Sequence, residues 1–351
     1  MVRIISIIGT ALAVLGLSGC SSDLDVTAPY KNITIVYAFL STTNADGTPA
    51  DTQWVKINKA FLGEGNAFTY AQVADSNEYT DAQLQAEVQA LNAQGTVTAS
   101  YPLQSKQVGD RDPGLFNGPQ HKLYYFTATL DPSKQYRLHA IAKGQEITAT
   151  TPIVGDLSPA APLLSSTFVF NFATSTGTYG SPQVRWTSGP NSKRYELSYR
   201  FNYDEVHVAG DTAHLSFTQF VGTTITSGTN GNEEGRQDIS GESFFQSIAA
   251  HVHPDANVVK RIFRGIDVIW AVASPDLNTY LQLASPISGI VEERPQYTNV
   301  QNGYGLFSSR YFRELRNKAI GDGSKHELVE GRYTAGLGFC FPGSSPPLGC
   351  D

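Results

Sequence analysis

The stretch Tyr195-Glu-Leu-Ser-Tyr-Arg-Phe-Asn-Tyr203 decides the fold class of this chain. Its odd positions are aromatic or aliphatic and its even positions are polar, which is the period-two pattern of a β-strand with one buried face. The apolar stretch Arg261–Ala273 is the strongest strand candidate in the same half of the chain. Together the two stretches are rich in the aromatic and β-branched residues that favour strands. We therefore expect a mainly β protein.

The first half of the chain carries further strand patterns. The run 54–61 alternates, with Trp54, Lys56 and Asn58 on one face. Residues 84–91 fit a strand or a helix, and we favour a strand because their neighbours are strands. Other expected strands cover residues 33–40, 122–130, 135–142 and 146–152. These strands and their tight turns predict an immunoglobulin-like or transthyretin-like β-sandwich.

The second half mixes strands with a few short helices. Ser240 is expected to cap a helix that ends near Ala250, and Pro275 to begin another that ends at Ala284. The remaining expectations are a long loop at 102–120, a loop or hairpin end at 223–238, a partly helical segment at 308–319 and a final strand at 332–339.

The N-terminal sequence predicts a lipid anchor. Arg3 precedes an apolar run that is shorter than the about 20 residues needed to span a bilayer. The run ends in Leu17-Ser18-Gly19-Cys20, where small residues precede a cysteine as in a bacterial lipobox. Cleavage before Cys20 and its acylation with chains such as palmitate would attach the mature protein stably to a membrane. An ordinary signal peptide that happens to end in cysteine is the alternative.

The residues after Cys20 bear on sorting. Ser21 is not the aspartate that argues for retention in the inner membrane, so the outer membrane is favoured. The run Ser21–Asp25 resembles the acidic export tags of surface lipoproteins in the Gram-negative lineage that uses Sus-type glycan uptake loci. We favour attachment at the cell surface, and attachment at the periplasmic face stays open as the alternative.

The charge balance excludes one class of partner. The chain has 25 Lys and Arg against 32 Asp and Glu, for a net charge of −7, and its basic residues form no cluster. A nucleic-acid-binding surface needs a basic stripe that contacts phosphates, so nucleic acid is not an expected partner.

Two cysteines remain after Cys20. Cys340 and Cys350 flank a loop rich in Pro and Gly, and in an oxidising compartment they are expected to form a disulfide. A metal site is the rival interpretation, although no His, Asp or Glu lies between the two cysteines.

The chain is expected to be organised around a proline-rich connector that begins at Pro152. The expected parts are a lipoprotein signal peptide at 1–19, a tether at 20–31, an immunoglobulin-like β-sandwich at 32–153, a linker at 154–164, a β-rich α+β domain at 165–339 and a C-terminal disulfide loop at 340–351.

Three blocks resemble a family of outer-membrane lipoproteins with a domain of unknown function, often encoded beside TonB-dependent receptors. The blocks are Val55–Asn66, Tyr136–Thr151 and Asn299-Val-Gln-Asn-Gly-Tyr-Gly-Leu-Phe307. The resemblance implies an envelope lipoprotein with an N-terminal sandwich and a mixed C-terminal domain. It implies no catalytic residues. Within the last block, glycines at positive φ explain the sequence without a ligand, in a turn that packs Tyr304 inward.

Aromatic side chains are the first candidate binding residues. Tyr195, Tyr199 and Tyr203, together with Trp186 and Tyr179, could stack on sugar rings. The alternative is that an alternating aromatic face on a central strand forms core.

Histidines and acids are weaker candidates. His251 and His253, with His207 or His214, could bind zinc, but histidines at a helix end also cap carbonyl groups. We expect no metal and no cofactor. The acids that could act in pairs in glycoside hydrolysis, as opposed to being solvated charges, are Asp110, Asp112, Glu292 and Glu293. No Gly-x-Ser-x-Gly elbow supports a serine hydrolase.

Three hypotheses follow. The first is a non-enzymatic outer-membrane lipoprotein, an accessory or ligand-binding partner of a TonB-dependent uptake receptor, with a glycan or peptide as the ligand. The second is a structural or adhesive envelope lipoprotein. The third is a glycan-active hydrolase.

Overall fold

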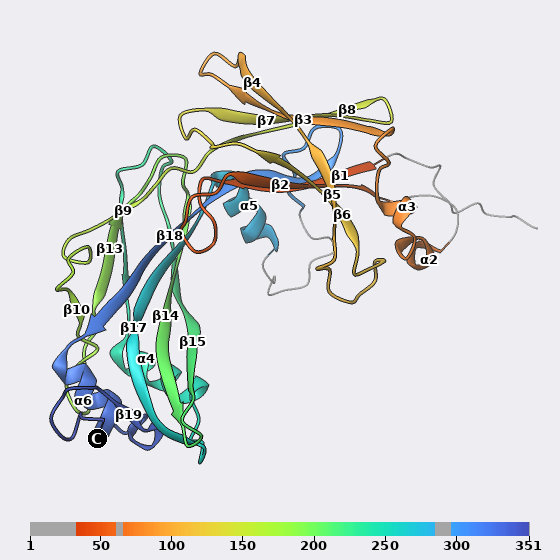
Figure 1. Ribbon diagram of the computed structural model, residues 1–351. Coiled ribbons are helices and arrows are strands. Elements are labelled where there is room, and N and C mark those ends of the chain that lie inside the picture. The colour runs from red at the N-terminus through yellow and green to blue at the C-terminus, as the bar shows by residue number, and fades with distance from the viewer. Residues whose placement is uncertain (1–32, 61–65, 285–295, 351) are drawn as a thin grey trace, which may run out of the picture.

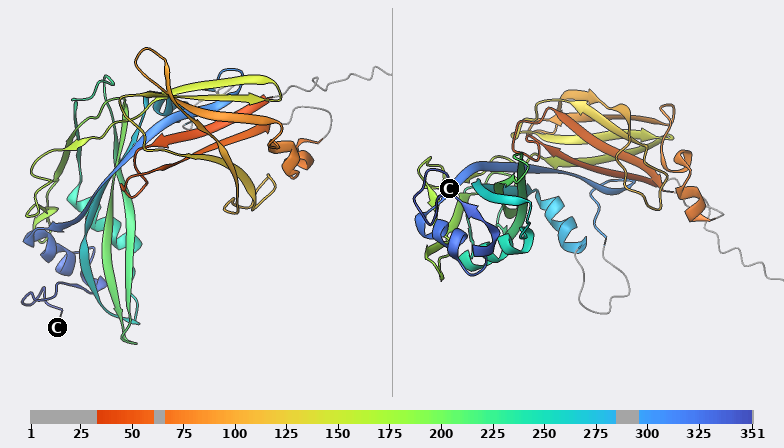
Figure 2. Two further views of the ribbon diagram at one scale, coloured as in Figure 1. Left: turned by 45° about the horizontal axis from the view of Figure 1, so that its top comes forward. Right: turned by 60° about the horizontal axis from the view of Figure 1, so that its bottom comes forward.

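The computed structural model describes residues 33–60, 66–284 and 296–350 (Figure 1). Strands account for 49% and helices for 14%, so the expected mainly β fold class is confirmed. The described chain forms two lobes that meet at an angle (Figures 1 and 2). In these described ranges, no helix is long and apolar enough to cross a membrane.

The first lobe consists of two packed β-layers. One layer contains β1 (Ile33–Ser41), β2 (Thr52–Ala60), β5 (Gln104–Val108) and β6 (His121–Thr127), and the other contains β3 (Leu84–Leu91), β4 (Val97–Pro102), β7 (Gln135–Ala142) and β8 (Gln145–Pro152). Val36, Ala38 and Leu40 of β1 are buried against Val88 and Leu138 of the opposite layer. β3 confirms the strand over residues 84–91. The finer assignment as immunoglobulin-like or transthyretin-like stays a prediction.

The second lobe is built around four long strands. These are β14 (Arg194–His207), β15 (Thr212–Ile225), β17 (Val258–Ala273) and β18 (Tyr304–Ile320). They are accompanied by α4 (Gly241–His251), α6 (Asp322–Glu330) and a small sheet of β9 (Ser158–Pro159), β13 (Gln183–Thr187) and β16 (Glu234–Asp238). The core is aromatic: the rings of Phe172 and Phe244 stack at 3.9 Å, and those of Trp186 and Trp270 meet edge-on at 6.1 Å.

Smaller elements complete the chain. α5 (Pro275–Ala284) lies in the angle between the lobes (Figures 1 and 2), and with α4 it confirms the two expected helices. The others are α2 (Ala67–Ala71), α3 (Ala74–Asn77), β10 (Val169–Phe170), β11 (Ala173–Ser175), β12 (Thr178–Tyr179) and β19 (Phe339–Cys340).

One strand, β18, belongs to both lobes. The strand order of the largest sheet is β15-β14-β17-β18-β1-β2-β6-β5, so the sheet runs through both lobes. The first part of β18 pairs in parallel with β1, and the later part pairs antiparallel with β17. Arg310 is the residue of overlap, because it pairs with Ser41 on one side and with Ala273 on the other.

Three local expectations are wrong. Residues 308–319 are not partly helical but form the centre of β18, because backbone pairing with strands on both sides outweighs a weak local preference. The expected strand at 332–339 is reduced to its last residue, which begins β19, and the segment before it forms turns and a single 3₁₀ turn at 335–337. The expected loop at 102–120 contains β5, which pairs with β6.

The two hydrophobic cores do not follow the order of the chain. Val300 and Phe307, far along the sequence, belong to the core of the first lobe. In the proline-rich connector, Ile153 is buried in the first core, whereas Val154 and Leu157 are buried in the second. The connector and the start of β18 therefore tie the lobes together.

The glycine-rich block at the start of β18 has a steric explanation. Gly305 has a φ of +111°, and a Cβ atom on it would lie 1.9 Å from the carbonyl oxygen of Val36. The expected positive φ is thus present at Gly305. Tyr304, however, does not pack inward but is 49% exposed, because it lies on the outer face of the sheet opposite Ile35.

We expect Gly305→Ala to lower the free energy of unfolding by about 2–3 kcal/mol or more, because it combines a strained φ with a backbone clash. Urea unfolding followed by circular dichroism would measure the change. Gly336→Ala is the matched control, since a Cβ there meets nothing within 4 Å. Equal stability of the two variants would contradict this account of the β1–β18 contact.

Two buried tyrosines should make the free energy of unfolding fall at alkaline pH. Burial, opposed by a hydrogen bond with Ser247, raises the pKa of Tyr199 to about 12. Burial, aided by a hydrogen bond to Asp156, raises the pKa of Tyr311 to about 12. Because an unfolded tyrosine has a pKa near 10, the unfolded chain binds fewer protons than the folded chain between these values.

We expect the stabilisation from these tyrosines to be complete below pH 10 and to be lost as the pH rises towards 12. Urea unfolding at pH 9 and pH 11 would measure it. Tyr311→Phe should make the decline less steep, since it removes one of the tyrosines whose pKa is raised by folding. A free energy of unfolding that is independent of pH over this range would contradict the prediction.

Candidate functional site

The outer face of β1 and its two neighbours carries an ordered set of side chains. Strand alternation sends Ile35, Tyr37 and Phe39 to the face opposite the core. In the register, Tyr37 lies opposite Lys56 of β2 on one side and Leu306 of β18 on the other. This layer is the lower one of the first lobe in Figure 1, so its outer face looks into the angle between the lobes.

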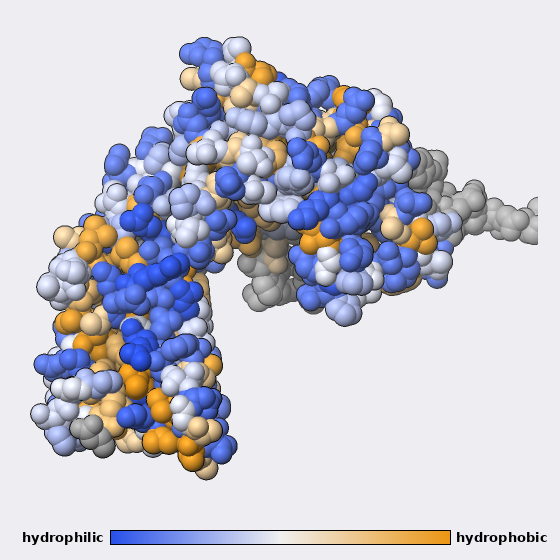
Figure 3. All heavy atoms as spheres, viewed as in Figure 1, coloured by the Kyte–Doolittle hydropathy of each residue, from blue (hydrophilic) through white to orange (hydrophobic). Residues whose placement is uncertain are grey.

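Three hollows meet at Tyr37 on this face. They have volumes of about 390, 380 and 430 Å³. We call them together the Tyr37 groove. Its main lining residues are Tyr280, Tyr297 and Tyr304 in the first hollow, Lys56, Arg111 and Phe116 in the second, and Phe39, Trp54, Lys56 and Arg310 in the third. The space-filling view shows the open angle into which the groove faces (Figure 3).

One end of the groove is rich in tyrosine. The rings of Tyr37 and Tyr280 meet edge-on with their centroids 6.2 Å apart. Their hydrogen bond, with burial, raises the pKa of Tyr37 to about 12. Burial and a hydrogen bond from Tyr297 to Asp276 likewise raise the pKa of Tyr297 to about 12. Both phenols therefore stay neutral near pH 7 and present aromatic faces together with polar hydroxyl groups.

The other end combines rings with cations. The guanidinium of Arg310 lies 5.7 Å from the ring centre of Phe39 and 5.0 Å from that of Phe312. Trp54 is 42% exposed, and its ring packs against Tyr125 with the centroids 5.3 Å apart. Burial and then the nearby charge of Arg111 lower the pKa of the Lys56 ammonium. Exposed rings with a few convergent polar groups are the usual lining of a ligand site.

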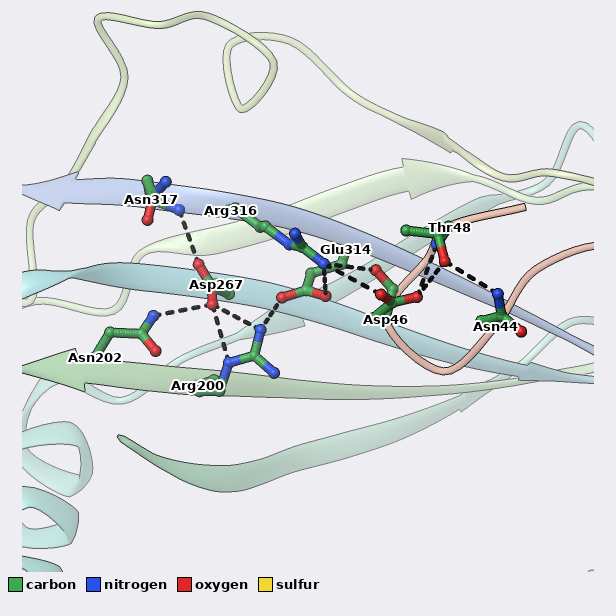
Figure 4. A network of polar contacts seen from close by, with 9 residues as sticks. All are labelled: Asn44, Asp46, Thr48, Arg200, Asn202, Asp267, Glu314, Arg316 and Asn317. Atoms are coloured by element: carbon green, nitrogen blue, oxygen red, sulfur yellow. Dashed lines mark hydrogen bonds and ion pairs between the residues drawn. The ribbon is translucent and has the colours of Figure 1, made fainter. Parts of the chain in front are cut away.

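A second polar cluster lies in the sheet of the second lobe (Figure 4). One carboxylate oxygen of Asp267 accepts hydrogen bonds from Arg200 at 2.9 and 3.0 Å and from Asn202 at 2.9 Å. The other accepts one from the backbone N–H of Asn317 at 2.8 Å. Glu314 pairs with Arg200 and also with Arg316 at 3.3 Å.

This cluster fastens the first lobe to the second. Arg316 donates a hydrogen bond of 3.0 Å to the carbonyl oxygen of Asp46, in the loop between β1 and β2. Hydrogen bonds from Thr48 lower the pKa of Asp46 and keep that carboxylate charged. Since Asp267 and Glu314 are both engaged by arginines, the cluster has the character of a structural ion network and not of a catalytic acid pair.

We expect Asp267→Ala to lower the free energy of unfolding by about 3–5 kcal/mol, because it leaves a half-buried guanidinium without one of its two acids. Glu234→Gln is the matched control: it breaks an exposed pair with Arg185 and should cost at most about 1 kcal/mol. Urea unfolding of both variants would measure the difference. A similar small loss in each would contradict the structural role of the network.

The aromatic residues proposed from the sequence lie in the core instead of at a binding surface. Tyr195, Tyr199, Tyr203 and Trp186 are at most 7% exposed, because the odd face of β14 packs inward against α4 and β13. The hydroxyl of Tyr199 hydrogen-bonds to Ser247 at 2.6 Å. Tyr179 is half-buried and donates a hydrogen bond to Glu327. The face of β14 that carries these rings therefore forms core, which was the alternative interpretation of the sequence.

The four histidines do not converge. His251 stacks on Phe217 at 4.3 Å, and His207 and His214 face Asp211 and Asp204. The carbonyl of His253 accepts a hydrogen bond from Arg261. In the part of the chain that the structure describes, no group of three or more His, Cys, Asp or Glu side chains could hold a metal ion.

The acids are also dispersed. Asp110 lies 3.5 Å from His121, and Asp112 lines the edge of the Tyr37 groove. Glu292 and Glu293 lie outside the described residues, as does Cys20. Cys340 and Cys350 form a disulfide with their Cα atoms 4.9 Å apart, which closes the C-terminal loop.

Comparisons with known proteins give no family. No family model matches the chain, and no curated protein is significantly similar to it. A solved structure of the C-terminal globular domain of an oligosaccharyltransferase from Pyrococcus abyssi aligns at 12% identity and a TM-score of 0.24, over 68% of this chain and 46% of that one. The partial N-terminal region of an enterococcal surface protein aligns at 9% identity and a TM-score of 0.16, over 71% and 92%. Similarities this low carry no argument about fold or function.

Sequence reasoning missed the Tyr37 groove, although one signal was present. The alternation in 54–61 had placed Trp54, Lys56 and Asn58 on one face, and that face lines the groove. A large ring beside a lysine on the polar side of a strand is the observation that could have located it. The contributions of β18 and α5 depend on pairing between distant segments.

Proposed function

We propose that this protein is a non-enzymatic lipoprotein of the outer membrane that binds a ligand in the Tyr37 groove as an accessory of a TonB-dependent nutrient-uptake receptor. The observation that carries the binding role is the set of three adjoining hollows lined by aromatic side chains. Tyr37 is 37%, Trp54 42% and Tyr304 49% exposed, and exposed rings gathered on one face of a sheet are typical of an interaction site.

The location of the protein is supported by its N-terminal sequence. A lipid on Cys20 would leave a short polar tether before β1, which begins at Ile33. The family resemblance of the blocks around Val55, Tyr136 and Asn299 supports the receptor as a partner. A glycan or a peptide is the ligand class that suits a groove of rings and polar groups.

One observation favours a second candidate, a structural or adhesive envelope lipoprotein. β15 lies at the edge of the largest sheet and spans 14 residues. Its sequence contains no Lys, Arg, Asp, Glu or Pro, which are the residues that usually block pairing at an edge. Leu215, Phe220 and Ile225 are exposed along it. Such an edge could accept a strand from another chain.

A mild-detergent pull-down from outer membranes with a C-terminal tag tests the proposed function. We expect a large β-barrel receptor in stoichiometric amount. Cys20→Ser is the control, because the protein without its lipid should leave the membrane fraction. Recovery of the lipoprotein alone would overturn the receptor role. Recovery of further copies of this protein paired with the tagged one, or of matrix proteins, would favour the structural role.

A further inference from the structure

The Tyr37 groove is basic although the protein is acidic. The whole chain has 25 Lys and Arg against 32 Asp and Glu. The described lining of the three hollows reverses this balance, with four cations and two acids: Lys56, Lys59, Arg111 and Arg310 against Asp51 and Asp112. Positive charge gathered in a hollow attracts anions and raises their local concentration.

Arg310 is held in place without a carboxylate partner among the described residues. Phe39 and Phe312 pack against its guanidinium. Other arginines of the same sheet differ, since Arg200 pairs with Asp267 and Arg261 with Glu205. Because rings contact the faces of a guanidinium and leave its N–H edge available, Arg310 is oriented to receive an anion in two parallel hydrogen bonds.

Lys56 lies across the same hollow from Arg310. It lines both the 380 Å³ and the 430 Å³ hollows, and within the described ranges no carboxylate forms an ion pair with it, although the charges of Glu78 and Asp110 act on it from farther away. Burial and the charge of Arg111 disfavour its charged form, and a bound anion would relieve both effects. The two cations come from strands on either side of β1, so they flank the exposed side chains of Tyr37 and Phe39.

From this arrangement we infer that the ligand of the groove is an acidic glycan, whose carboxylates bind Lys56 and Arg310 and whose sugar rings stack on Tyr37 and Trp54. This inference rests on the proposed function, because it names the ligand class of the same groove. A sugar ring offers a flat apolar face to an aromatic side chain. A peptide of Asp and Glu residues could satisfy the cations but has no such face, so the exposed rings favour the glycan.

Calorimetric titration of the full-length protein in detergent tests the inference, with oligogalacturonate as the acidic probe and oligogalactose of the same length as the neutral one. We expect the acidic probe to bind at least about tenfold more tightly, since one charge-assisted hydrogen bond exceeds 1.4 kcal/mol. Raising the salt concentration should weaken the binding of the acidic probe alone.

Variants assign the effect to the two cations. Lys56→Gln with Arg310→Gln should weaken acidic binding by about 100-fold and change neutral binding by less than about threefold. Arg310→Lys should keep part of the affinity, because lysine keeps the positive charge but lacks the two parallel N–H donors of the guanidinium. Lys325→Gln with Arg185→Gln is the matched control: it removes the same charge outside the groove and should change neither.

The outcomes separate the two proposals. If oligogalactose binds as well as oligogalacturonate, the acidic class is wrong while a glycan-binding role stands. If neither sugar binds, both the acidic class and glycan binding by the groove are wrong. Equal binding of poly-glutamate, lost in the same double variant, would replace the glycan by an acidic peptide. If the double variant loses affinity for both sugars equally, the two residues support the structure of the groove and do not act through their charge. If the double variant does not fold, the single variant Lys56→Gln, at a half-buried surface position, provides the same test.

Discussion

The change of pairing partner along β18 is the constraint on which the rest of the structure depends. Up to Arg310 the strand belongs to the first lobe, and from Arg310 onward it belongs to the second. A continuous backbone cannot bend sharply without losing ladder hydrogen bonds, so the angle between the lobes is set by the twist of one sheet. The ion network of Asp267 and Glu314, which reaches Asp46 through Arg316, reinforces the same junction.

The groove follows from this junction. Both cores cover the same face of the sheet, because Phe307 of β18 belongs to the first core and Tyr311, four residues on, belongs to the second. The opposite face is left without a second layer, and it carries Tyr37, Phe39 and Arg310. α5 covers only part of it, which buries Leu306 and Ser308. The side chains that remain open stand on paired strands and are therefore already ordered, so a ligand that binds them loses little side-chain entropy on the protein's side.

The sequence predicted those parts of the fold that depend on local pattern. The alternation in 54–61 and 195–203 identified two strands, and the capping residue Ser240 identified α4. It failed at 308–319, because serines and charged residues that pack against two different neighbours show no simple period. The aromatic face of β14 was correctly seen but its role was ambiguous, since a buried ring and a ligand-binding ring have the same pattern. The groove needed the β1–β18 register, which no local signal encodes.

The contrast between the two polar regions of the sheet is itself informative. In the network every arginine has an acid, and the cluster is closed to ligands by its own hydrogen bonds. In the groove Lys56 and Arg310 are desolvated in part and form no ion pair with an acid among the described residues, which costs free energy that packing elsewhere must offset. The large sheet pairs Arg200, Arg261 and Arg316 with acids, and it gains nothing for stability by leaving Lys56 and Arg310 exposed to a hollow. Their arrangement is therefore best explained by an anion that binds there.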